Sequence, residues 1–206
     1  MNSITTPVMR PGTKMDGILD ILAGRWSSRA IDSSAPIAPE VLERLLEAAR
    51  WAPSSFNNQP WRFLAFGPEN ADSLEKARKA LKRKNAWALA APRLIFVLCR
   101  TDMPGSRIPS GMPMIPTYES GMAALQMALQ AAYEGLVFHQ MLGFNQRRIR
   151  EDFKVPENFA ILTAVAIGWP GNPELVPEEM RFMETEIRTR KAISELVFSD
   201  GAVPSE

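Results

Sequence analysis

The sequence predicts an α+β fold, in which helices and strands follow one another without a regular strand–helix–strand alternation. Residues 94–99 form an apolar run with the length of a central strand buried on both faces. Residues 41–52 instead repeat their apolar side chains at helical spacing. With 206 residues, 46% of them hydrophobic, the chain can form a sizeable core. We expect a single domain over residues 15–206, preceded by an arm over residues 1–14.

Two helices are predicted before the first strand. Asp16 is expected to cap a helix that ends at Gly24. Its apolar face would be formed by Ile18, Leu19 and Leu22. A second helix should begin at Pro39, where a proline is tolerated in the first turn, and run to Ala52. Its stripe would consist of Val41, Leu42, Leu45, Leu46, Ala49 and Ala52.

A strand and a third helix follow. Residues 61–66 alternate in the manner of a strand, with Trp61, Phe63 and Ala65 on one face. Residues 70–84 are expected to be helical, with a basic end that complements the helix dipole. The lysines and arginines between positions 78 and 84 are interpreted as a solvated face.

The second half begins with the central strand over residues 93–100, and residues 102–116, rich in Pro, Gly and Met, should form a loop. Residues 117–133 predict a long buried helix marked by Met122, Leu125, Leu129, Ala132 and Tyr133. Small residues elsewhere on this helix indicate close packing on more than one side. A short strand near Val137 and a helix from Asn145 come next.

The last part of the chain should contain a strand over residues 160–167, which ends at the segment 168–171. A polar, charged helix follows, and residues 193–198 are expected to end the ordered chain.

Charge and cysteine content exclude several classes of protein. The formal net charge is only +1, which gives no general attraction to nucleic acid or to acidic membranes. Cys99 is the one cysteine and cannot form an internal disulfide, so we expect a reducing compartment and a cytoplasmic location. No stretch has the apolar length of a membrane span, and no secretory signal is visible.

The usual catalytic patterns are missing from the sequence. One histidine and one cysteine cannot form a familiar metal cluster, and neither common type of glycine-rich phosphate loop occurs. His139 is more often a packed, hydrogen-bonded residue than a catalyst. We therefore expect that an enzyme built from this chain takes its chemistry from a cofactor, with no catalytic side chain.

Residues 52–63 form the most informative segment. Hydroxyl and amide side chains are concentrated there between a helix and a strand, and Pro53 and Pro60 restrict the backbone. Such a loop suits recognition of a planar heterocycle. The alternative is a helix-to-strand turn with no ligand.

Arginines at both ends of the chain form a second pattern. Arg25 and Arg29 follow the first helix, and Arg188 and Arg190 lie near the C-terminus. Guanidinium groups bind phosphate in bidentate fashion and keep their charge, and hydroxyl or backbone donors of Ser27 and Ser28 could assist them. The alternative is that each arginine is a surface charge of little consequence.

Together, these segments resemble the FMN-dependent nitroreductase family. That family carries an Arg-x-Ser-x-Arg/Lys segment, then a Pro-Ser-Ser-x-Asn-x-Gln-Pro-Trp loop, then a Lys/Arg-x-Arg pair. Here the three are residues 25–29, 53–61 and 188–190, in the same order. The resemblance covers residues 17–197. It implies a nitroreductase-like fold with a central mixed or antiparallel sheet flanked by helices, in a homodimer that holds FMN at the subunit interface.

The resemblance also implies roles for individual residues. Arg25 and Arg190 would hold the FMN phosphate, with Arg188, Trp26 and Ser27 beside them, and Arg29 would lie near the ribityl and pyrimidine side. The partner subunit's flavin would be approached by Pro53, Ser54, Ser55 and Asn57. Asn85 would lie at the pyrimidine edge, and Leu142 and Gly143 belong to the segment whose backbone meets flavin N5.

The activity implied by the resemblance is electron transfer from NADH or NADPH, through FMN, to a nitroaromatic, a quinone or a related small-molecule acceptor by a ping-pong mechanism. Other members dehalogenate, oxidise heterocycles or break down flavin, and the sequence carries no clear marker for these reactions. A non-catalytic flavin-binding protein and a ligand-free helical interaction module remain alternatives. The sequence leaves open the physiological acceptor and the choice between NADH and NADPH.

Overall fold

The computed structural model describes residues 14–102, 112 and 114–197. Its centre is a five-stranded sheet in the order β1-β5-β3-β2, with β4 paired to β5. The strands are β1 (Ile31–Asp32), β2 (Trp61–Phe66), β3 (Arg93–Arg100), β4 (Val137–Met141) and β5 (Phe159–Pro170). All of these pairings are antiparallel. β5 pairs with β3 along one edge and with β4 and β1 along the other.

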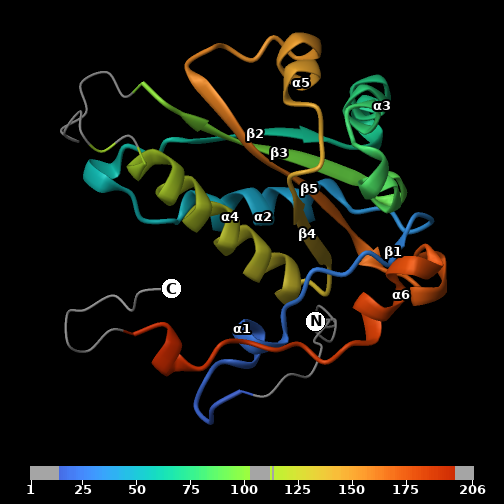
Figure 1. The fold of residues 1–206 in the computed structure, drawn as a ribbon. Helices are drawn as coiled ribbons and strands as arrows, with labels where there is room; N and C mark the ends of the chain where they lie inside the picture. Colours follow the sequence, from blue (N-terminus) through green and yellow to red (C-terminus); the bar gives the residue numbers. More distant parts are fainter. Residues whose placement is uncertain (1–13, 103–111, 113, 198–206) are drawn as a thin grey trace.

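Helices surround this sheet, as the sequence predicts (Figure 1). The α-helices are α1 (Asp20–Gly24), α2 (Pro39–Arg50), α3 (Ala71–Lys79), α4 (Ile115–Tyr133), α5 (Gln146–Asp152) and α6 (Glu178–Thr185). Short 3-10 helices are η1 (Ser55–Asn57), η2 (Pro68–Asn70), η3 (Arg83–Ala90), η4 (Pro173–Leu175) and η5 (Ile193–Glu195).

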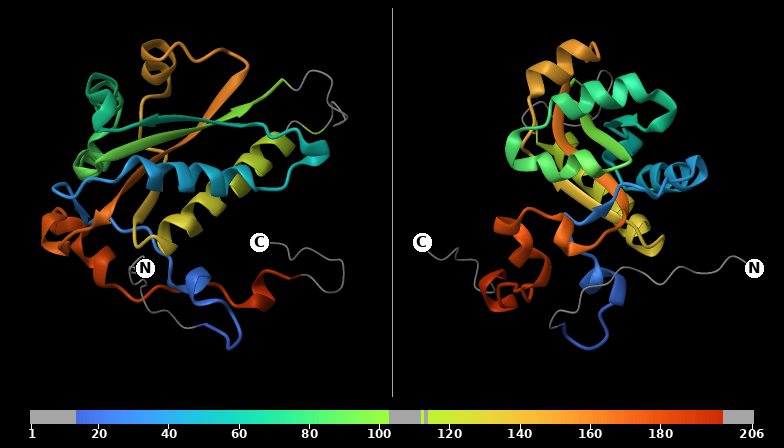
Figure 2. Two further views of the ribbon diagram at one scale, coloured as in Figure 1. Left: turned by 180° about the vertical axis from the view of Figure 1, so that it is seen from behind. Right: turned by 90° about the vertical axis from the view of Figure 1, so that its right-hand side faces the viewer.

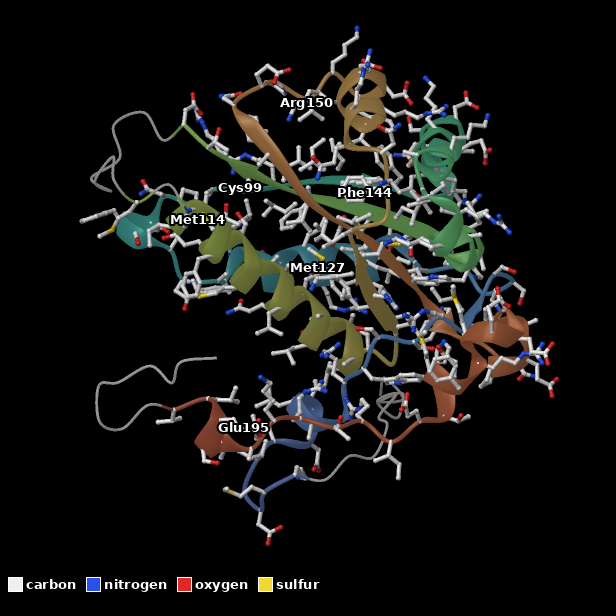
Figure 3. The ribbon with its side chains drawn as sticks, viewed as in Figure 1. Cys99, Met114, Met127, Phe144, Arg150 and Glu195 are labelled. Carbon is white, nitrogen blue, oxygen red and sulfur yellow. The ribbon has the colours of Figure 1, made fainter. Side chains whose placement is uncertain are left out.

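The core lies in two layers, one on each face of the sheet. On one face, α2 and α4 cover the sheet, and Met127 of α4 is fully buried between them (Figure 3). On the other face, α3, η3 and α5 pack against the sheet. Strand β3 serves both layers, because Leu94 and Phe96 face one and Ile95 and Val97 face the other. The prediction of a central strand buried on both faces is confirmed.

The predicted start of the first helix is wrong. The chain turns at Gly17, whose φ is +85°, and helix α1 begins only at Asp20. A backbone with this φ cannot continue a right-handed helix, so Asp16 is not its cap. The apolar residues Ile18, Leu19 and Leu22 are exposed on this surface and do not join the core.

The helix predicted over residues 70–84 is also too long. Helix α3 ends at Lys79, because the following backbone bonds to the β4–α5 turn. The N–H of Lys82 donates to the Gly143 carbonyl at 2.8 Å, and the N–H of Asn145 donates to the Ala80 carbonyl at 2.8 Å. These hydrogen bonds compete with a further helical turn, and η3 follows instead.

Strand β5 is longer than predicted. It runs through residues 168–170, which were expected to end it, since Trp169 and Pro170 pair with β1. The two-residue strand β1 was not predicted, because so short a segment has no periodicity to read.

Helix α4 buries only part of the face that the sequence predicts: Ala132 is buried and Met122 packs against the core, as expected. Leu125 and Tyr133 are about half exposed, whereas the buried positions are mainly small. They include Ala123, Ala124, Ala128, Ala131 and Ala132, together with Met127. Small side chains let α4 approach the sheet and α2 closely, while Leu125 and Tyr133 remain on the outside.

Both ends of the described chain lie on one side of the sheet. In Figures 1 and 2, α1 and the segment from residue 186 to η5 lie next to each other, beyond the C-terminal end of α4. Residues 1–13 of the expected arm, residues 103–111 and 113 of the predicted loop, and residue 198 of the expected chain end lie outside the described residues.

Candidate functional site

Residues 25–29 form an irregular segment between α1 and β1, and it is anchored by α6. The buried carboxylate of Glu184 accepts a hydrogen bond from the Ser28 hydroxyl at 2.7 Å and from the Arg29 N–H at 2.9 Å. The Ser28 oxygen also accepts from the N–H of Ala30 at 3.0 Å. These contacts fix the backbone of the segment, while Trp26 stays half-buried and Ser27 is exposed.

His139 of β4 also holds this segment, through a hydrogen bond to its backbone. Its Nδ1 lies 2.9 Å from the Ser28 carbonyl, which makes Nδ1 the protonated nitrogen. Burial lowers the pKa of His139 to about 4, and the nearby charges of Arg29 and Arg25 add to this effect. The ring is therefore neutral at pH 7, and it packs against Trp87 of η3 with a centroid separation of 4.4 Å.

The arginines of the two chain ends meet at this segment. Burial and the positive charge of nearby Arg190 lower the pKa of Arg25, so two guanidinium groups share one region. Arg188 donates hydrogen bonds to the carbonyl oxygens of Arg25 and Ala23, and these bonds tie the C-terminal segment to the end of α1. Arg29 lies with its guanidinium carbon 5.9 Å from the centre of the Trp87 ring.

Like charges brought together on a folded surface cost free energy unless an anion neutralises them. The region of Arg25 and Arg190 therefore has the character of a phosphate site, with Arg188 holding the backbone that carries Arg25.

Gly143 and Asn85 also meet, although they are far apart in the sequence. The Asn85 side-chain amide donates to the Gly143 carbonyl at 3.0 Å and is buried there. A Cβ atom at position 143 would lie 2.4 Å from Asn85 Nδ2 and 2.7 Å from Lys84 Cε. Glycine is thus required by the packing of these two side chains. Neighbouring Leu142 is 77% exposed, so the outer side of this turn is open.

The loop after α2 adopts a strained backbone with polar groups outward. Phe56, Asn57 and Gln59 have positive φ values of 51°, 56° and 46°. Pro53, Ser55 and Asn57 are exposed, whereas the Ser54 hydroxyl accepts from the Gln59 N–H at 3.0 Å. Non-glycine residues with such angles persist only where their surroundings hold them.

Glu119 of α4 provides part of that support. Its carboxylate is 2% exposed, and one oxygen accepts from the Ser55 N–H at 2.6 Å. The other oxygen has no hydrogen-bond partner among the described residues. A buried acceptor of this kind favours one position of the loop, because moving Ser55 away would leave the whole carboxylate unsatisfied.

The predicted site residues therefore form two separate groups. The first group contains residues 25–29 and Arg190, near the C-terminal end of α4. Asn85 and residues 142–143 are connected to it through Trp87, which contacts both Arg29 and His139. The second contains residues 53–57, at the N-terminal end of α4 (Figures 1 and 2). Helix α4 has 19 residues, which is about 28 Å of helix. Within one chain, the two groups do not share a site.

The first group suits a phosphorylated, planar cofactor such as FMN. It offers clustered guanidinium groups, an open backbone turn at Leu142 and the buried amide of Asn85. The described residues hold no group of three or more His, Cys, Asp or Glu side chains that could bind a metal ion. Within that part of the chain, no helix is long and apolar enough to cross a membrane.

Three supporting residues were not predicted from the sequence. Glu184 and Trp87 carry no local signal, because their partners lie far along the chain. Glu119 did offer one, since a carboxylate on an otherwise apolar helix is costly to bury without a purpose. Ser28 was noted beside Ser27, and the structure makes Ser28 the buried member of the pair.

Comparison with known proteins shows what the chain resembles. A family model described as "Nitroreductase family" matches residues 22–169. The 5,6-dimethylbenzimidazole synthase of Rhodospirillum rubrum is 27% identical over 194 residues, which is 84% of this chain and 91% of the synthase. A protein of Haemophilus influenzae, provisionally named an NAD(P)H nitroreductase, is 29% identical over 82% of this chain and 95% of its own length.

A solved structure supports the same relationship. The crystal structure of an oxidoreductase containing FMN superposes with a TM-score of 0.82 and 29% sequence identity, and the match covers 95% of this chain and 97% of the other. The nitroreductase-like arrangement of helices around an antiparallel sheet is thus confirmed.

Proposed function

Because the chain belongs to the nitroreductase family, we propose that it is an FMN-dependent oxidoreductase that passes electrons from NADH or NADPH to a nitroaromatic, a quinone or a related small molecule. The FMN-containing oxidoreductase of similar structure and the provisionally named NAD(P)H nitroreductase of Haemophilus influenzae support this assignment. A cytoplasmic location would suit the buried, unpaired thiol of Cys99.

The contact between the C-terminal segment and the end of α1 is the observation that carries the proposal. Arg188 donates to the carbonyls of Arg25 and Ala23, and Arg190 lies close enough to Arg25 to lower its pKa. Arg25 and Arg190 come from opposite ends of the chain, and each repels the other. The dianionic phosphate of FMN would neutralise both charges, and charge-assisted hydrogen bonds to guanidinium groups are about twice as strong as neutral ones. Arg188 would contribute by keeping the backbone of Arg25 in place.

When bound, FMN would supply two-electron transfer chemistry. The chain's own residues would bind and orient the ring: Asn85 and the backbone around Gly143 on one side, and Arg29 with its fixed positive charge on another. A positive charge held close to the flavin favours a state in which the ring carries negative charge. His139 would stay neutral at pH 7, because burial lowers its pKa to about 4.

A homodimer would complete the site. The loop at residues 53–57 and the segment after α1 lie toward opposite ends of α4, so we infer that a second copy brings the loop to the flavin. The outer faces of α1, α2 and α4 enclose an apolar hollow of about 350 Å³. It is lined by Ile21, Ala48, Trp51, Gln126, Leu129, Gln130 and Tyr133. Exposed apolar side chains beside it, such as Trp51 and Tyr133, would suit an interface with a second copy.

Cofactor identification tests the proposal. The purified protein should be yellow and should release FMN, identified by its mass, on denaturation. Arg25→Ala and Arg190→Ala should each weaken FMN binding by about tenfold to hundredfold, because each removes charge-assisted contacts to phosphate. Arg147→Ala, on an exposed face of α5, removes the same charge elsewhere and should leave FMN binding unchanged. A colourless protein that takes up no FMN would refute the assignment.

A second candidate follows from the synthase of Rhodospirillum rubrum. In that case, the FMN-loaded protein would consume its flavin, as family members that break down flavin do, and would form 5,6-dimethylbenzimidazole, detectable by mass. The oxidoreductase predicts instead that FMN is recovered intact after many turnovers with a quinone, so one analysis of the flavin separates the two activities.

A further inference from the structure

The surface around the C-terminal end of α3 carries a concentrated positive charge. Six of the nine residues from 76 to 84 are lysine or arginine, and none is acidic, although the whole chain has a net charge of only +1. They are Lys76, Arg78, Lys79, Lys82, Arg83 and Lys84. We call this segment the basic run. Such a concentration creates a local field that attracts anions even when the molecule is nearly neutral.

The basic run borders a groove with an apolar lining. The groove has a volume of about 410 Å³ and is lined by Glu75, Arg78, Lys79, Leu81, Lys82, Arg83, Ala86 and Leu89. Its one carboxylate, Glu75, is paired with Lys79 at 3.7 Å. Leu81, Ala86 and Leu89 offer an apolar surface, and the lysines and arginines surround it. A ligand with a flat apolar ring and attached phosphate matches this combination.

Arg78 is held rigidly in that groove. One of its Nη atoms donates to the carbonyl of Ala91 at 3.0 Å, and its Nε is buried without a hydrogen-bond partner among the described residues. A guanidinium that is already fixed by the backbone loses little conformational freedom when it binds an anion. The groove thus contains one cation that the backbone holds in place, together with the other lysines and arginines of its lining.

A second groove continues from the first toward the site described above. It measures about 490 Å³ and shares Arg83 and Ala86 with the first groove. It is lined further by Lys84, Trp87, Pro177, Glu179 and Met180. Trp87 packs against His139 at a tilt and lies under Arg29, and the stem of Lys84 packs beside Gly143. A ligand extending between the two grooves would pass Arg83.

We propose that the basic run binds the adenosine 2′-phosphate of NADPH, so that this protein uses NADPH in preference to NADH. The inference rests on the proposed oxidoreductase function, and it names the reductant of that same site. NADPH carries a flat adenine ring and one phosphate more than NADH, and the first groove pairs apolar surface with an excess of cations. The groove, with a volume of about 410 Å³, has room for a single nucleotide. The basic surfaces that bind nucleic acid backbones are longer and more exposed.

Direct binding tests the groove without any redox reaction. Titration of the FMN-loaded protein with 2′,5′-ADP and with 5′-AMP, by calorimetry, compares two ligands that differ only in the 2′-phosphate. We expect 2′,5′-ADP to bind at least about tenfold more tightly. Arg83→Ala and Lys82→Ala should each reduce that ratio, whereas Arg83→Lys should keep most of it. Arg147→Ala, whose side chain is 87% exposed outside both grooves, is the matched control.

Kinetics provide the second measurement. Arg83→Ala should raise the KM for NADPH by about tenfold and change the KM for NADH by less than twofold, with equal FMN content and melting temperature. Equal binding of 2′,5′-ADP and 5′-AMP by the wild type, or an unchanged ratio in both Lys82→Ala and Arg83→Ala, would overturn the inference. If such a protein still binds FMN and its reduced flavin is reoxidised by a quinone, the proposed function survives and only the NADPH inference falls.

Discussion

The carboxylate of Glu184 accepts a hydrogen bond from the hydroxyl of Ser28 at 2.7 Å, across 156 positions of the sequence. Both side chains are buried, and the second oxygen of Glu184 receives the Arg29 N–H. Helix α6 therefore determines where the segment that carries Arg25 and Arg29 lies. Because Arg188 follows α6 and donates to the Arg25 carbonyl, the C-terminal part of the chain holds this segment at two points.

Removal of this anchor should weaken both the fold and cofactor binding. Glu184→Ala leaves the Ser28 hydroxyl and the Arg29 N–H without their buried acceptor, at a cost of about 2–3 kcal/mol in the free energy of unfolding. FMN affinity should fall by about tenfold, because the phosphate-binding backbone is released. Glu186→Ala, an exposed glutamate nearby, should change neither quantity. Denaturant titration and FMN fluorescence titration measure the two effects, and unchanged FMN affinity in a destabilised Glu184→Ala protein would show that the anchor is structural only.

Mixed dimers can reveal whether each flavin uses residues of both subunits. Arg25→Ala and Asn57→Ala should each give a homodimer with two weakened sites. When the two variants are coexpressed with different tags, the mixed dimer should regain tight FMN binding at about half of its sites, because one site then contains both native residues. Dimers of two differently tagged Arg25→Ala chains serve as the control. If the mixed dimer shows no tight site at all, residues 25 and 57 act on the same flavin from one chain.

His139 should make stability depend on pH. Its pKa is lowered from 6.5 to about 4 in the folded state, so the unfolded chain binds the proton more readily between these values. Stability is therefore highest above pH 6.5 and falls as the pH decreases toward 4, by about 3 kcal/mol at most. His139→Gln should show a shallower decrease over this range. Equal pH dependence of the two proteins in denaturant titrations would mean that the pKa of His139 is the same in the folded and the unfolded chain.

Steady-state kinetics should give parallel double-reciprocal lines for the reductant and a quinone acceptor. Hydride transfer needs reacting atoms about 3–3.5 Å apart, and one flavin face cannot offer that contact to two partners at once. His139→Ala should retain most of its turnover, because the ring is neutral and turned toward Ser28. Intersecting lines would indicate two simultaneous sites. A folded, FMN-loaded His139→Ala protein with a rate lower by about a thousandfold would assign an acid–base role to His139.

Local patterns were sufficient for elements whose environment is uniform along their length. Strand β2 has the predicted bounds. Strand β3 has the predicted burial on both faces, because a strand that is apolar at every position must be covered by other elements on each face. The ordered segments at residues 25–29, 53–61 and 188–190 led to the correct family, since they combine residue type with position in the chain.

Long-range contacts decided what the patterns left undetermined. Helix α3 ends early because its last backbone groups bond to the turn at residues 143–145. Helix α4 turns its alanines inward because close approach to the sheet and α2 outweighs burial of Leu125 and Tyr133. The site depends on Glu184, Glu119 and Trp87, whose partners lie on other elements. A hydrogen bond or a like-charge contact between distant segments leaves no periodic trace in a sequence, so only the folded chain could bring Arg25 to Arg190 and separate both from Asn57.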